Sequence, residues 1–360
     1  MRKKICFISA DIGHSGGTER VCTLIANELA SRGYNVTILS FWKGNPPFFD
    51  VDQRVKVDYL IHNRYEAWLK KTYIYAVIKL ALYIRKYKLD VVIDVDTFLG
   101  KYSTAATYLT KFKLVSWEHF NYLNTLKDPK RAKVLEAVKK RSTKLLVLTK
   151  DDKRMHIDMA HFPEGMIEQI YNPTPFIIES TYESSERIFL AVGRLTYQKG
   201  FDRLLDIWKT VEEELPQWKL VIVGSGEEKK SLEEKINKLK LYNIEICPVT
   251  NSIATFYERA SIYVMTSRYE GYPMVLLEAK SKGVPIISYD CKTGPSELVT
   301  DGVSGFLVDD GDCNTFAKRM IQLAKENELR HSFSNRCLQE IQECTVKKIG
   351  DQWECLLENI

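Results

Sequence analysis

The sequence lacks any apolar run that could cross a membrane as a helix. Of its 360 residues, 45% are hydrophobic, but no stretch approaches the roughly 18 to 20 uninterrupted apolar residues that a membrane-spanning helix needs. The start, "MRKKICFISADIG", follows its basic residues with only a short apolar segment before Asp11. That segment is too short for the core of a signal peptide. We therefore expect a first β-strand there and a cytoplasmic chain.

The eight cysteines form no Cys-x-x-Cys pair and are scattered along the chain. A zinc site or a disulfide framework would need closer spacing, so we expect reduced, mostly buried thiols. The sequence also has no low-complexity tract and no internal repeat at a solenoid period. Repeat architectures are therefore excluded, and the length indicates two domains.

Charge is distributed unevenly between the two halves of the chain. Residues 1–176 hold 29 Lys and Arg against 18 Asp and Glu, whereas the remainder holds 23 against 29. Such an asymmetry favours two domains with different partners. The basic half should prefer something anionic, such as a membrane surface or a phosphorylated acceptor, and no nucleic acid is expected.

Apolar runs typical of buried strands alternate with helical patterns along most of the chain. This alternation predicts parallel sheets covered on both faces. The two prolines in "YNPTPFI" and the polar segment after them predict a linker near 171–186, after which the alternation restarts. We predict an α/β protein of two Rossmann-like, doubly wound domains that face each other across a cleft. The predicted domains are 1–175 and 176–345, and a C-terminal helix at 346–360 could pack back on the first domain.

The segment "AVGRLTYQKG" (191–200) places two cations at the end of a predicted strand. Arg194 follows the strand directly, and Lys199 comes five positions later, before a helical pattern. Cations beside a helix start suit a diphosphate, and each charge-assisted hydrogen bond there contributes about 1.5 to 3 kcal/mol. The alternative is an ordinary surface loop.

The segment "SRYEGYPMVLLEAKSKG" (267–283) carries two glutamates separated by seven residues. Glu270 lies in a predicted loop, and Glu278 lies on the second turn of a helix whose first residue we expect to be Pro273. A carboxylate can accept hydrogen bonds from paired sugar hydroxyls, and a helix N-terminus offers free N–H groups to an anion. The alternative is two solvated glutamates that flank a core helix.

Together, three motifs resemble those of the retaining glycosyltransferases of family 4, which have the GT-B fold. They are G-G-x-E-R at 16–20, V-G-R-L-x-x-x-K-G at 192–200, and E-G-x-P-x-x-x-x-E at 270–278. They occur in the family's order, and the resemblance extends over nearly the whole chain. It implies transfer of a sugar from a nucleotide-sugar donor to a hydroxyl, with retention of the anomeric configuration.

The resemblance also assigns roles in the second domain. Arg194 and Lys199 match the pair that holds the donor diphosphate. Glu278 matches the glutamate that binds the nucleotide ribose, and Glu270 matches the catalytic glutamate near the donor sugar. Five further positions match the donor-binding helix start and the loop before it: Gly271, Tyr272, Met274, Val275 and Leu276.

Two positions in the first domain are implied as well. Gly16 and Gly17 match the family's glycine loop and should approach the donor from the first domain, because "GHSGGTER" lacks the G-x-G-x-x-G spacing of a dinucleotide site. His119 matches the catalytic histidine beside the reacting sugar. A histidine next to aromatic residues is equally compatible with a structural role.

The segment 64–88 is apolar, rich in tyrosine, and basic. Its cations Lys70, Lys71, Arg85, Lys86 and Lys88 could each contribute about 1 kcal/mol of attraction to an anionic bilayer. The alternative is a helix that packs on its own sheet. We therefore leave open whether this segment contacts a membrane.

The predicted function is transfer of a hexose or N-acetylhexosamine, most simply from a UDP-sugar. The expected acceptor is a lipid-linked or growing surface glycan of the lipopolysaccharide, capsule or O-antigen type, handled at the inner face of the cell membrane. No metal and no cofactor is expected, and we interpret the D-x-D at Asp94 and Asp96 as part of the fold. Two alternatives stay open: a sugar-nucleotide 2-epimerase with the same architecture, and a non-catalytic, membrane-associated glycan-assembly subunit.

Overall fold

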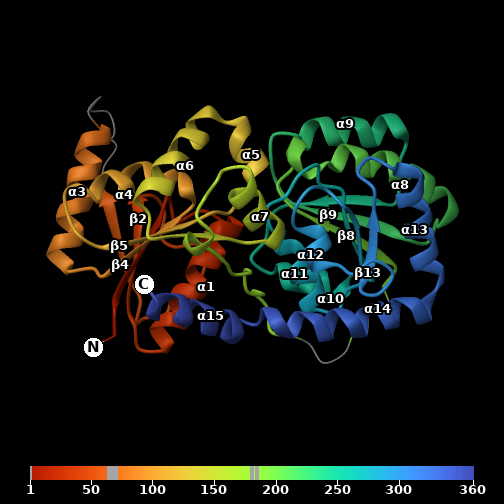
Figure 1. Cartoon of the computed structure of the whole chain (residues 1–360). Coiled ribbons are helices and arrows are strands. Elements are labelled where there is room, and N and C mark those ends of the chain that lie inside the picture. The colour runs from red at the N-terminus through yellow and green to blue at the C-terminus, as the bar shows by residue number, and fades with distance from the viewer. Residues whose placement is uncertain (1, 63–71, 179–181, 183–185) are drawn as a thin grey trace. The chain divides into compact units, whose positions relative to one another are not determined.

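The computed structural model describes residues 2–62, 72–178, 182 and 186–360. The chain divides into two compact units (Figure 1). Unit 1 comprises Met1–Pro175 together with Val346–Ile360, and unit 2 comprises Phe176–Thr345. The boundary between Pro175 and Phe176 falls inside the proline-containing segment.

Unit 1 contains a parallel sheet of seven strands in the order β3-β2-β1-β4-β5-β6-β7. The order reverses direction beside β1, as in doubly wound folds. The central strands β1, β4, β5 and β6 are buried except at the first residue of β1, β5 and β6, because helices cover both faces of the sheet. The strands are β1 Lys4–Ser9, β2 Asn35–Trp42, β3 Lys56–Ile61, β4 Val91–Val95, β5 Lys113–Trp117, β6 Lys144–Val147 and β7 Ile167–Gln169.

Successive side chains of β1 point to opposite faces of this sheet. Cys6 and Ile8 face the core shared with α3 and α4, and Phe7 lies 6.0 Å from the ring of Trp353 in the C-terminal helix. The helices of unit 1 are α1 Gly17–Ser31, α3 Thr72–Tyr87, α4 Gly100–Ala106, α5 Tyr122–Lys127, α6 Pro129–Arg141, α7 Lys150–Asp158 and α15 Val346–Glu358, with short 3₁₀ turns η1 Thr97–Leu99 and η2 Glu164–Met166.

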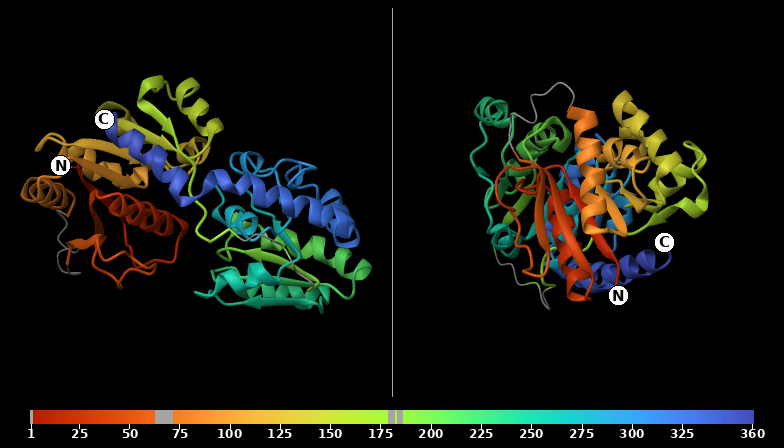
Figure 2. Two further views of the ribbon diagram at one scale, coloured as in Figure 1. Left: turned by 90° about the horizontal axis from the view of Figure 1, so that it is seen from below. Right: turned by 90° about the vertical axis from the view of Figure 1, so that its left-hand side faces the viewer.

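The C-terminal helix α15 packs beside α1. Arg32, just after α1, donates to Asp351 at 2.7 Å and to Glu354 at 2.9 Å. Near the chain start, Arg2 donates to Glu354 at 2.6 Å. Charged contacts around the buried Trp353 therefore tie the end of the chain to its beginning. The two ends of the chain lie close together in both views of Figure 2.

Unit 2 contains a second parallel sheet, of six strands in the order β10-β9-β8-β11-β12-β13. The strands are β8 Ile188–Val192, β9 Lys219–Val223, β10 Ile244–Cys247, β11 Ile262–Met265, β12 Ile286–Tyr289 and β13 Gly305–Val308. The helices are α8 Phe201–Glu214, α9 Lys229–Leu239, α10 Ile253–Arg259, α11 Met274–Ser281, α12 Pro295–Leu298, α13 Cys313–Lys325 and α14 Asn327–Glu340, with 3₁₀ turns η3 Tyr197–Lys199 and η4 Ile341–Cys344.

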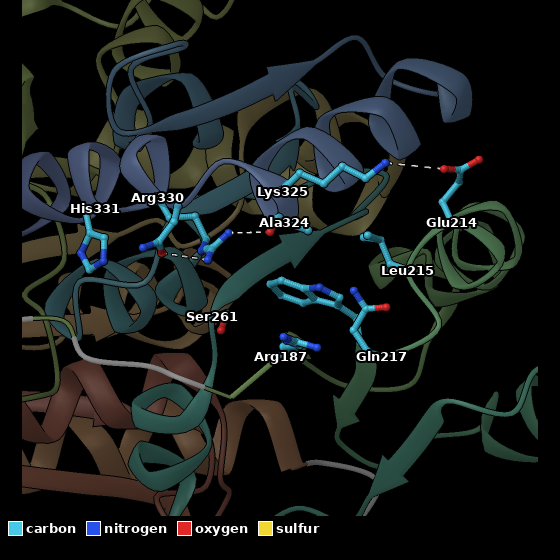
Figure 3. A pocket seen from close by; sticks show the side chains of 11 residues that line it. Arg187, Glu214, Leu215, Gln217, Ser261, Ala324, Lys325, Arg330 and His331 are labelled. Atoms are coloured by element: carbon cyan, nitrogen blue, oxygen red, sulfur yellow. Dashed lines mark hydrogen bonds and ion pairs between the residues drawn. The ribbon is translucent and has the colours of Figure 1, made fainter.

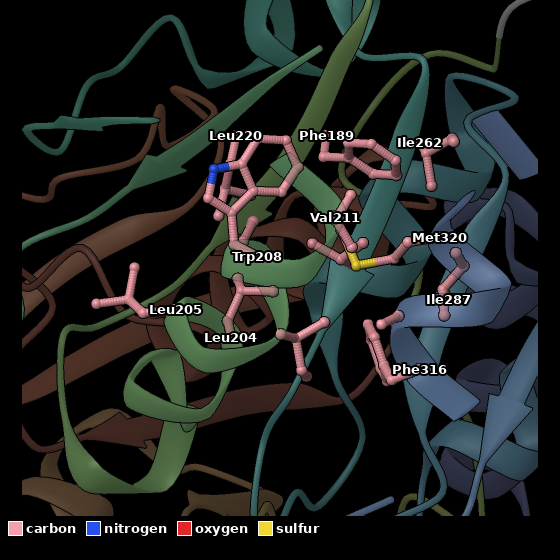
Figure 4. Close-up of a cluster of buried hydrophobic side chains, with 14 of the residues drawn as sticks. Phe189, Leu204, Leu205, Trp208, Val211, Leu220, Ile262, Ile287, Phe316 and Met320 are labelled. Carbon is pink, nitrogen blue, oxygen red and sulfur yellow. The ribbon is translucent and has the colours of Figure 1, made fainter. Parts of the chain in front are cut away.

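The main core of unit 2 lies between this sheet and the helices α8 and α13 (Figure 4). Phe189 of β8 lies 5.7 Å from the ring of Trp208 in α8 and 4.8 Å from that of Trp218. Phe316 and Met320 of α13 close the same cluster. A large, fully buried core of this kind holds the strand ends, and the loops that follow them, in fixed positions.

The prediction of two doubly wound α/β units is confirmed, with differences in detail. The edge strands β3 and β7 were not predicted, because β3 mixes charged with apolar residues and β7 has only three residues. Pro273 is the N-cap of α11 and not its first residue. The helical C-terminal region breaks at Glu326 and at 341–345.

Within the described part of the chain, no helix combines the length and apolarity needed to cross a bilayer. Lys70 and Lys71 of the basic segment lie outside the described residues.

Candidate functional site

The loop after β8 holds Lys199 over a glycine. A Cβ atom at Gly193 would lie only 3.2 Å from the side-chain carbons of Lys199, so the lysine stem occupies the space that a larger residue would need. The 3₁₀ turn η3 ends at Lys199, and Gly200 follows in the left-handed conformation with φ of 65°. Gly200 can adopt this conformation without strain, and α8 begins at the next residue.

Hydrogen bonds hold a second loop, which follows β11, against the 3₁₀ turn η3. Arg268 donates to the carbonyl of Tyr197 at 2.7 Å and to both carboxylate oxygens of Asp202, at 2.8 and 2.7 Å. The side chain of Gln198 donates to the carbonyl of Tyr269 at 3.0 Å. Because β8 and β11 are neighbours in the sheet, these contacts bring their carboxyl-end loops together.

Lys199 and Glu270 form an ion pair at the centre of these two loops. The Lys199 Nζ lies 2.7 Å from the Glu270 Oε1, and the side chains are only 15% and 7% exposed. Removing either partner would leave a charge in a poorly solvated place, which is far more costly than the net contribution of the pair. The predicted diphosphate cation and the predicted catalytic glutamate are thus brought into direct contact.

Arg194 differs from Lys199 in its surroundings. Its side chain is exposed, and within the described residues no hydrogen bond or ion pair of its guanidinium is found. The Arg194 guanidinium therefore has hydrogen-bond donors available for an anion beside the loop that follows β8. The structure shows no contact between Arg194 and Lys199.

The start of α11 lies next to Glu270. Met274 and Val275 are partly exposed, and Pro273 offers no side-chain cap to their N–H groups. Leu276 is fully buried, and its backbone N–H already donates to the carbonyl of Pro273 at 3.0 Å. The expected donor-facing helix start is therefore open at its first two residues, while the N–H of the third is engaged.

The loop between Glu270 and α11 is tightly packed. Tyr272 is buried, with its hydroxyl 3.8 Å from the Cys344 sulfur. A Cβ at Gly294 would lie 2.9 Å from the carbonyl oxygen of Gly271. Thr293 donates through its hydroxyl to the Glu270 carbonyl at 2.8 Å. These contacts fix the backbone on both sides of the glutamate.

Glu278 lies on the second turn of α11, as predicted, and is 5% exposed. Its Oε2 accepts a hydrogen bond of 2.6 Å from the hydroxyl of Tyr257, which is fully buried. The ring of Tyr257 stacks on that of Tyr263 at 5.6 Å. Tyr257 was missed in the sequence, because a tyrosine within the helical pattern of α10 is typical of a core residue.

In unit 1, Gly16 and Gly17 lie where α1 begins. Gly16 is the N-cap and Gly17 the first helical residue, with no side-chain cap. The carboxylate of Glu19 lies where a Gly16 side chain would be, so a larger residue at position 16 would have to displace it. Burial raises the pKa of Glu19. The glycine loop is thus a helix start with a carboxyl group close to its first turn.

His119 follows β5 in unit 1 and stacks against Trp117, with the ring centroids 4.6 Å apart. Its Nε2 is buried and has no hydrogen-bond partner among the described residues. Burial lowers the pKa of His119 to about 4, against a weaker opposing effect of Asp96. The ring is therefore neutral near pH 7 and could offer or accept one hydrogen bond.

A polar cluster that was not predicted lies beside His119. Glu118 is buried and accepts from the hydroxyl of Thr97 and, at 2.9 Å, from the N–H of Phe120. Asp96 has φ of 110° and accepts two hydrogen bonds from Arg131, at 2.9 and 3.0 Å. No spacing in the sequence indicates this cluster, since its members come from three separate segments.

Comparison with known proteins agrees with the motifs. The family model described as Glycosyltransferase Family 4 matches residues 15–175, and that described as Glycosyl transferases group 1 matches residues 175–339. The amylovoran biosynthesis glycosyltransferase AmsD of Erwinia amylovora is 33% identical over 98% of this chain and 99% of its own length.

Two further similarities also span whole chains. A Campylobacter jejuni α-1,4-N-acetyl-D-galactosaminyltransferase, named for a diphospho-undecaprenol-linked glycan substrate, is 27% identical over 99% of both chains. The structure of Anabaena HepE in complex with UDP and glucose matches with a TM-score of 0.84 and 18% identity, covering all of both chains. At that identity, the likeness shows the fold, which is the GT-B fold.

The comparisons confirm the predicted fold and enzyme class. The chain belongs to the retaining glycosyltransferases of family 4, the group 1 glycosyl transferases, and is a glycosyltransferase.

Proposed function

We propose that the protein transfers a hexose or N-acetylhexosamine from a UDP-sugar to a hydroxyl of a lipid-linked or growing surface glycan. The observation that carries the proposal is the buried Lys199–Glu270 ion pair beside the open start of α11. The pair places a cation, which suits a diphosphate, at hydrogen-bond distance from a carboxylate, which suits the hydroxyls of the attached sugar. The complex of HepE with UDP and glucose supports UDP as the nucleotide.

In this proposal, unit 2 binds the donor. Lys199, Arg194 and the first N–H groups of α11 face the diphosphate, whereas Glu270 accepts from sugar hydroxyls and Glu278 accepts from those of the ribose. Gly271 and Tyr272 shape the loop between the two glutamates. From unit 1, Gly16 and Gly17 contribute backbone N–H groups to the donor, and His119 contributes a neutral ring to the sugar.

The chemical step breaks the bond between the anomeric carbon and the diphosphate oxygen. A new bond to the acceptor oxygen forms on the same face of the sugar, and the acceptor proton passes to the departing phosphate. Negative charge grows on the diphosphate as it leaves, and cations already fixed in place stabilise it with little reorganisation. Lys199 meets this requirement because its position is set by Gly193 and Glu270.

The proposed acceptor follows from the relatives and from the charge of the chain. AmsD is named for amylovoran biosynthesis, and the Campylobacter enzyme for a glycan on diphospho-undecaprenol. The first 176 residues carry the excess of Lys and Arg, which favours an anionic, membrane-borne acceptor.

The helix α3 supports peripheral contact with an anionic membrane. One of its faces, with Ala76, Leu80 and Ile84, is buried on the sheet. The opposite face exposes an apolar stripe at helical spacing: Ile74 is 62% exposed, Ile78 46% and Leu82 57%. Both sequence interpretations of this segment are thus compatible with one helix. Its exposed cations are Arg85 and Lys86, with Lys88 just beyond the helix.

A donor screen tests the proposed function. The purified protein is incubated with UDP-, GDP- and ADP-sugars, each with and without a diphospho-polyprenol-linked acceptor, and the products are assigned by NMR. We expect release of UDP only when acceptor is present, with retention at the anomeric carbon. Exclusive use of a GDP- or ADP-sugar would contradict the donor assignment, and isomerisation of the donor alone would indicate the epimerase.

A further inference from the structure

A cavity of about 620 Å³ opens in unit 2 at the amino ends of the strands, whereas the proposed donor site lies at their carboxyl ends (Figure 3). Three of its lining residues, Arg187, Trp218 and Ser261, directly precede strands β8, β9 and β11. Lys199 and Glu270 follow the carboxyl ends of β8 and β11. The five residues of β8 span roughly 16 Å, so the cavity is separate from that site.

Cations from three segments converge on this cavity. Arg187 lies before β8, Lys325 is the last residue of α13, and Arg330 lies in the first turns of α14. Glu214 is the one carboxylate among the described residues that line the cavity, and it lies 3.6 Å from Lys325. Both side chains of that pair are more than half exposed, so the pair is weak and readily exchanged for a stronger partner.

The two guanidinium groups have no carboxylate partner within the described part of the chain. Arg330 is held by neutral acceptors: the carbonyls of Leu323 and Ala324, each at 2.7 Å, and the Asn327 side-chain oxygen at 2.9 Å. Burial lowers the pKa of Arg330, against a weaker opposing effect of Tyr182.

Arg187 is exposed, and no hydrogen bond of its side chain is found in the described ranges. The carboxylate next to it in sequence, Glu186, is already engaged by Arg259 through two hydrogen bonds of 2.9 and 2.8 Å. Two arginines therefore face one cavity, one exposed and one partly buried, and neither has a carboxylate partner among the residues that the structure describes.

We propose that this cavity binds a small phosphorylated molecule, a sugar phosphate or nucleoside phosphate, at a second site distinct from the donor site. Guanidinium groups match the oxygens of a phosphate with paired hydrogen bonds. The amides of Gln217 and Asn327 line the same cavity and can bind hydroxyl groups. Leu215 and Trp218 form its apolar floor, and the volume is that of a typical small-molecule site.

The test is titration of the full-length protein with inorganic pyrophosphate by calorimetry. Arg194→Ala is included in every variant, so that the proposed donor site is weakened throughout. We expect this protein to bind pyrophosphate, and the added substitution Arg187→Gln to weaken binding about tenfold or more. The matched control is Lys230→Gln on α9, where the lysine side chain is 90% exposed, and it should change nothing.

Equal affinities in the Arg187→Gln and Lys230→Gln proteins would overturn the proposal, as would the absence of millimolar pyrophosphate binding in both. A hexose 1-phosphate and vesicles of phosphatidylglycerol serve as further probes. Competition by the hexose phosphate supports a soluble ligand. Competition by the vesicles alone would contradict it in favour of a lipid headgroup.

Discussion

At the scale of single residues, a hydrogen bond from Tyr257 holds the carboxylate of Glu278, the proposed ribose-binding residue. Tyr257 donates to Glu278 at 2.6 Å and is fully buried. It does not itself face the donor in our proposal, so its role is to position Glu278. A buried hydrogen bond to a charged group contributes about 1.5 to 3 kcal/mol.

Replacing Tyr257 with phenylalanine should therefore raise the KM for the donor about tenfold while changing kcat little. Steady-state kinetics with varied donor measure this split. Tyr289→Phe is the matched control, because that tyrosine is equally buried in unit 2 but its hydroxyl donates to the Cys313 sulfur at 3.4 Å and not to Glu278. Equal KM values for the two variants would refute the positioning role.

Asp94 shows a second effect at this scale. It is fully buried in β4, accepts from the hydroxyls of Ser103 and Ser116 at 2.6 and 3.2 Å, and has a pKa raised by burial to about 7. In the unfolded chain its pKa is near 4. Between about pH 4 and about pH 7, the folded protein therefore keeps a proton on Asp94 that the unfolded chain has released. The bound proton stabilises the folded protein, and this stabilisation is lost as the pH rises through 7.

Asp94→Asn lacks this titration. Its free energy of unfolding should fall below that of the wild type at pH 5, and the difference should narrow by up to about 3 kcal/mol by pH 8, because the folded pKa of about 7 lies roughly two pH units above pH 5. Urea unfolding at both pH values measures the change. A gap that stays constant or widens with pH would show that Asp94 is ionised in the folded protein.

At the scale of elements, α3 has two apolar faces, and only one of them is covered by the sheet. Replacing Ile78 and Leu82 with serine should reduce sedimentation with vesicles that contain phosphatidylglycerol several-fold, because exposed apolar area and basic residues act together in interfacial binding. The fold should persist, since these side chains are 46% and 57% exposed.

The control for this experiment is Tyr242→Ser, a change at a residue of unit 2 that is 82% exposed. Unchanged sedimentation of the Ile78→Ser, Leu82→Ser protein would contradict membrane contact through α3. High salt should weaken the binding of the wild type, as expected of an electrostatic contribution.

The elements also show what the sequence could predict. The central strands and most helices follow from apolar runs and helical periodicity, because they are buried on defined faces. The edge strand β3 carries Lys56 and Asp58, which are paired with each other at 2.8 Å, and its exposed edge explains why the pattern was not recognised. The three residues of β7 are too few to produce a periodic signal.

For the site, the motifs indicated Lys199, Glu270 and Glu278 as separate functional residues. Their contacts could not be predicted, because the Lys199–Glu270 pair joins residues 71 positions apart and depends on how two loops meet at adjacent strand ends. Tyr257 was not predicted for the same reason, since its hydrogen bond to Glu278 depends on how α10 packs against α11. The cavity lined by Arg187 and Arg330, at the amino ends of the strands of unit 2, contains none of the three sequence motifs.

At the scale of the whole molecule, the chain consists of two units of one architecture with different charge and different site residues. The end of the chain returns to unit 1, where α15 contacts α1 through Arg32. In the proposed function, the loops after β8 and β11 of unit 2 bind the donor diphosphate. Arg194 is the best residue for testing this binding, because its exposed side chain has no partner in the described chain and so contributes little to folding.

The most direct measurement is kcat/KM for sugar transfer by the Arg194→Ala protein, compared with the wild type and with Lys230→Ala. We expect a loss of about 10- to 100-fold in Arg194→Ala, equivalent to one charge-assisted hydrogen bond to the leaving diphosphate, with an unchanged melting temperature. Lys230→Ala should match the wild type. A kcat/KM for Arg194→Ala equal to that of the wild type would contradict the assignment of the donor site.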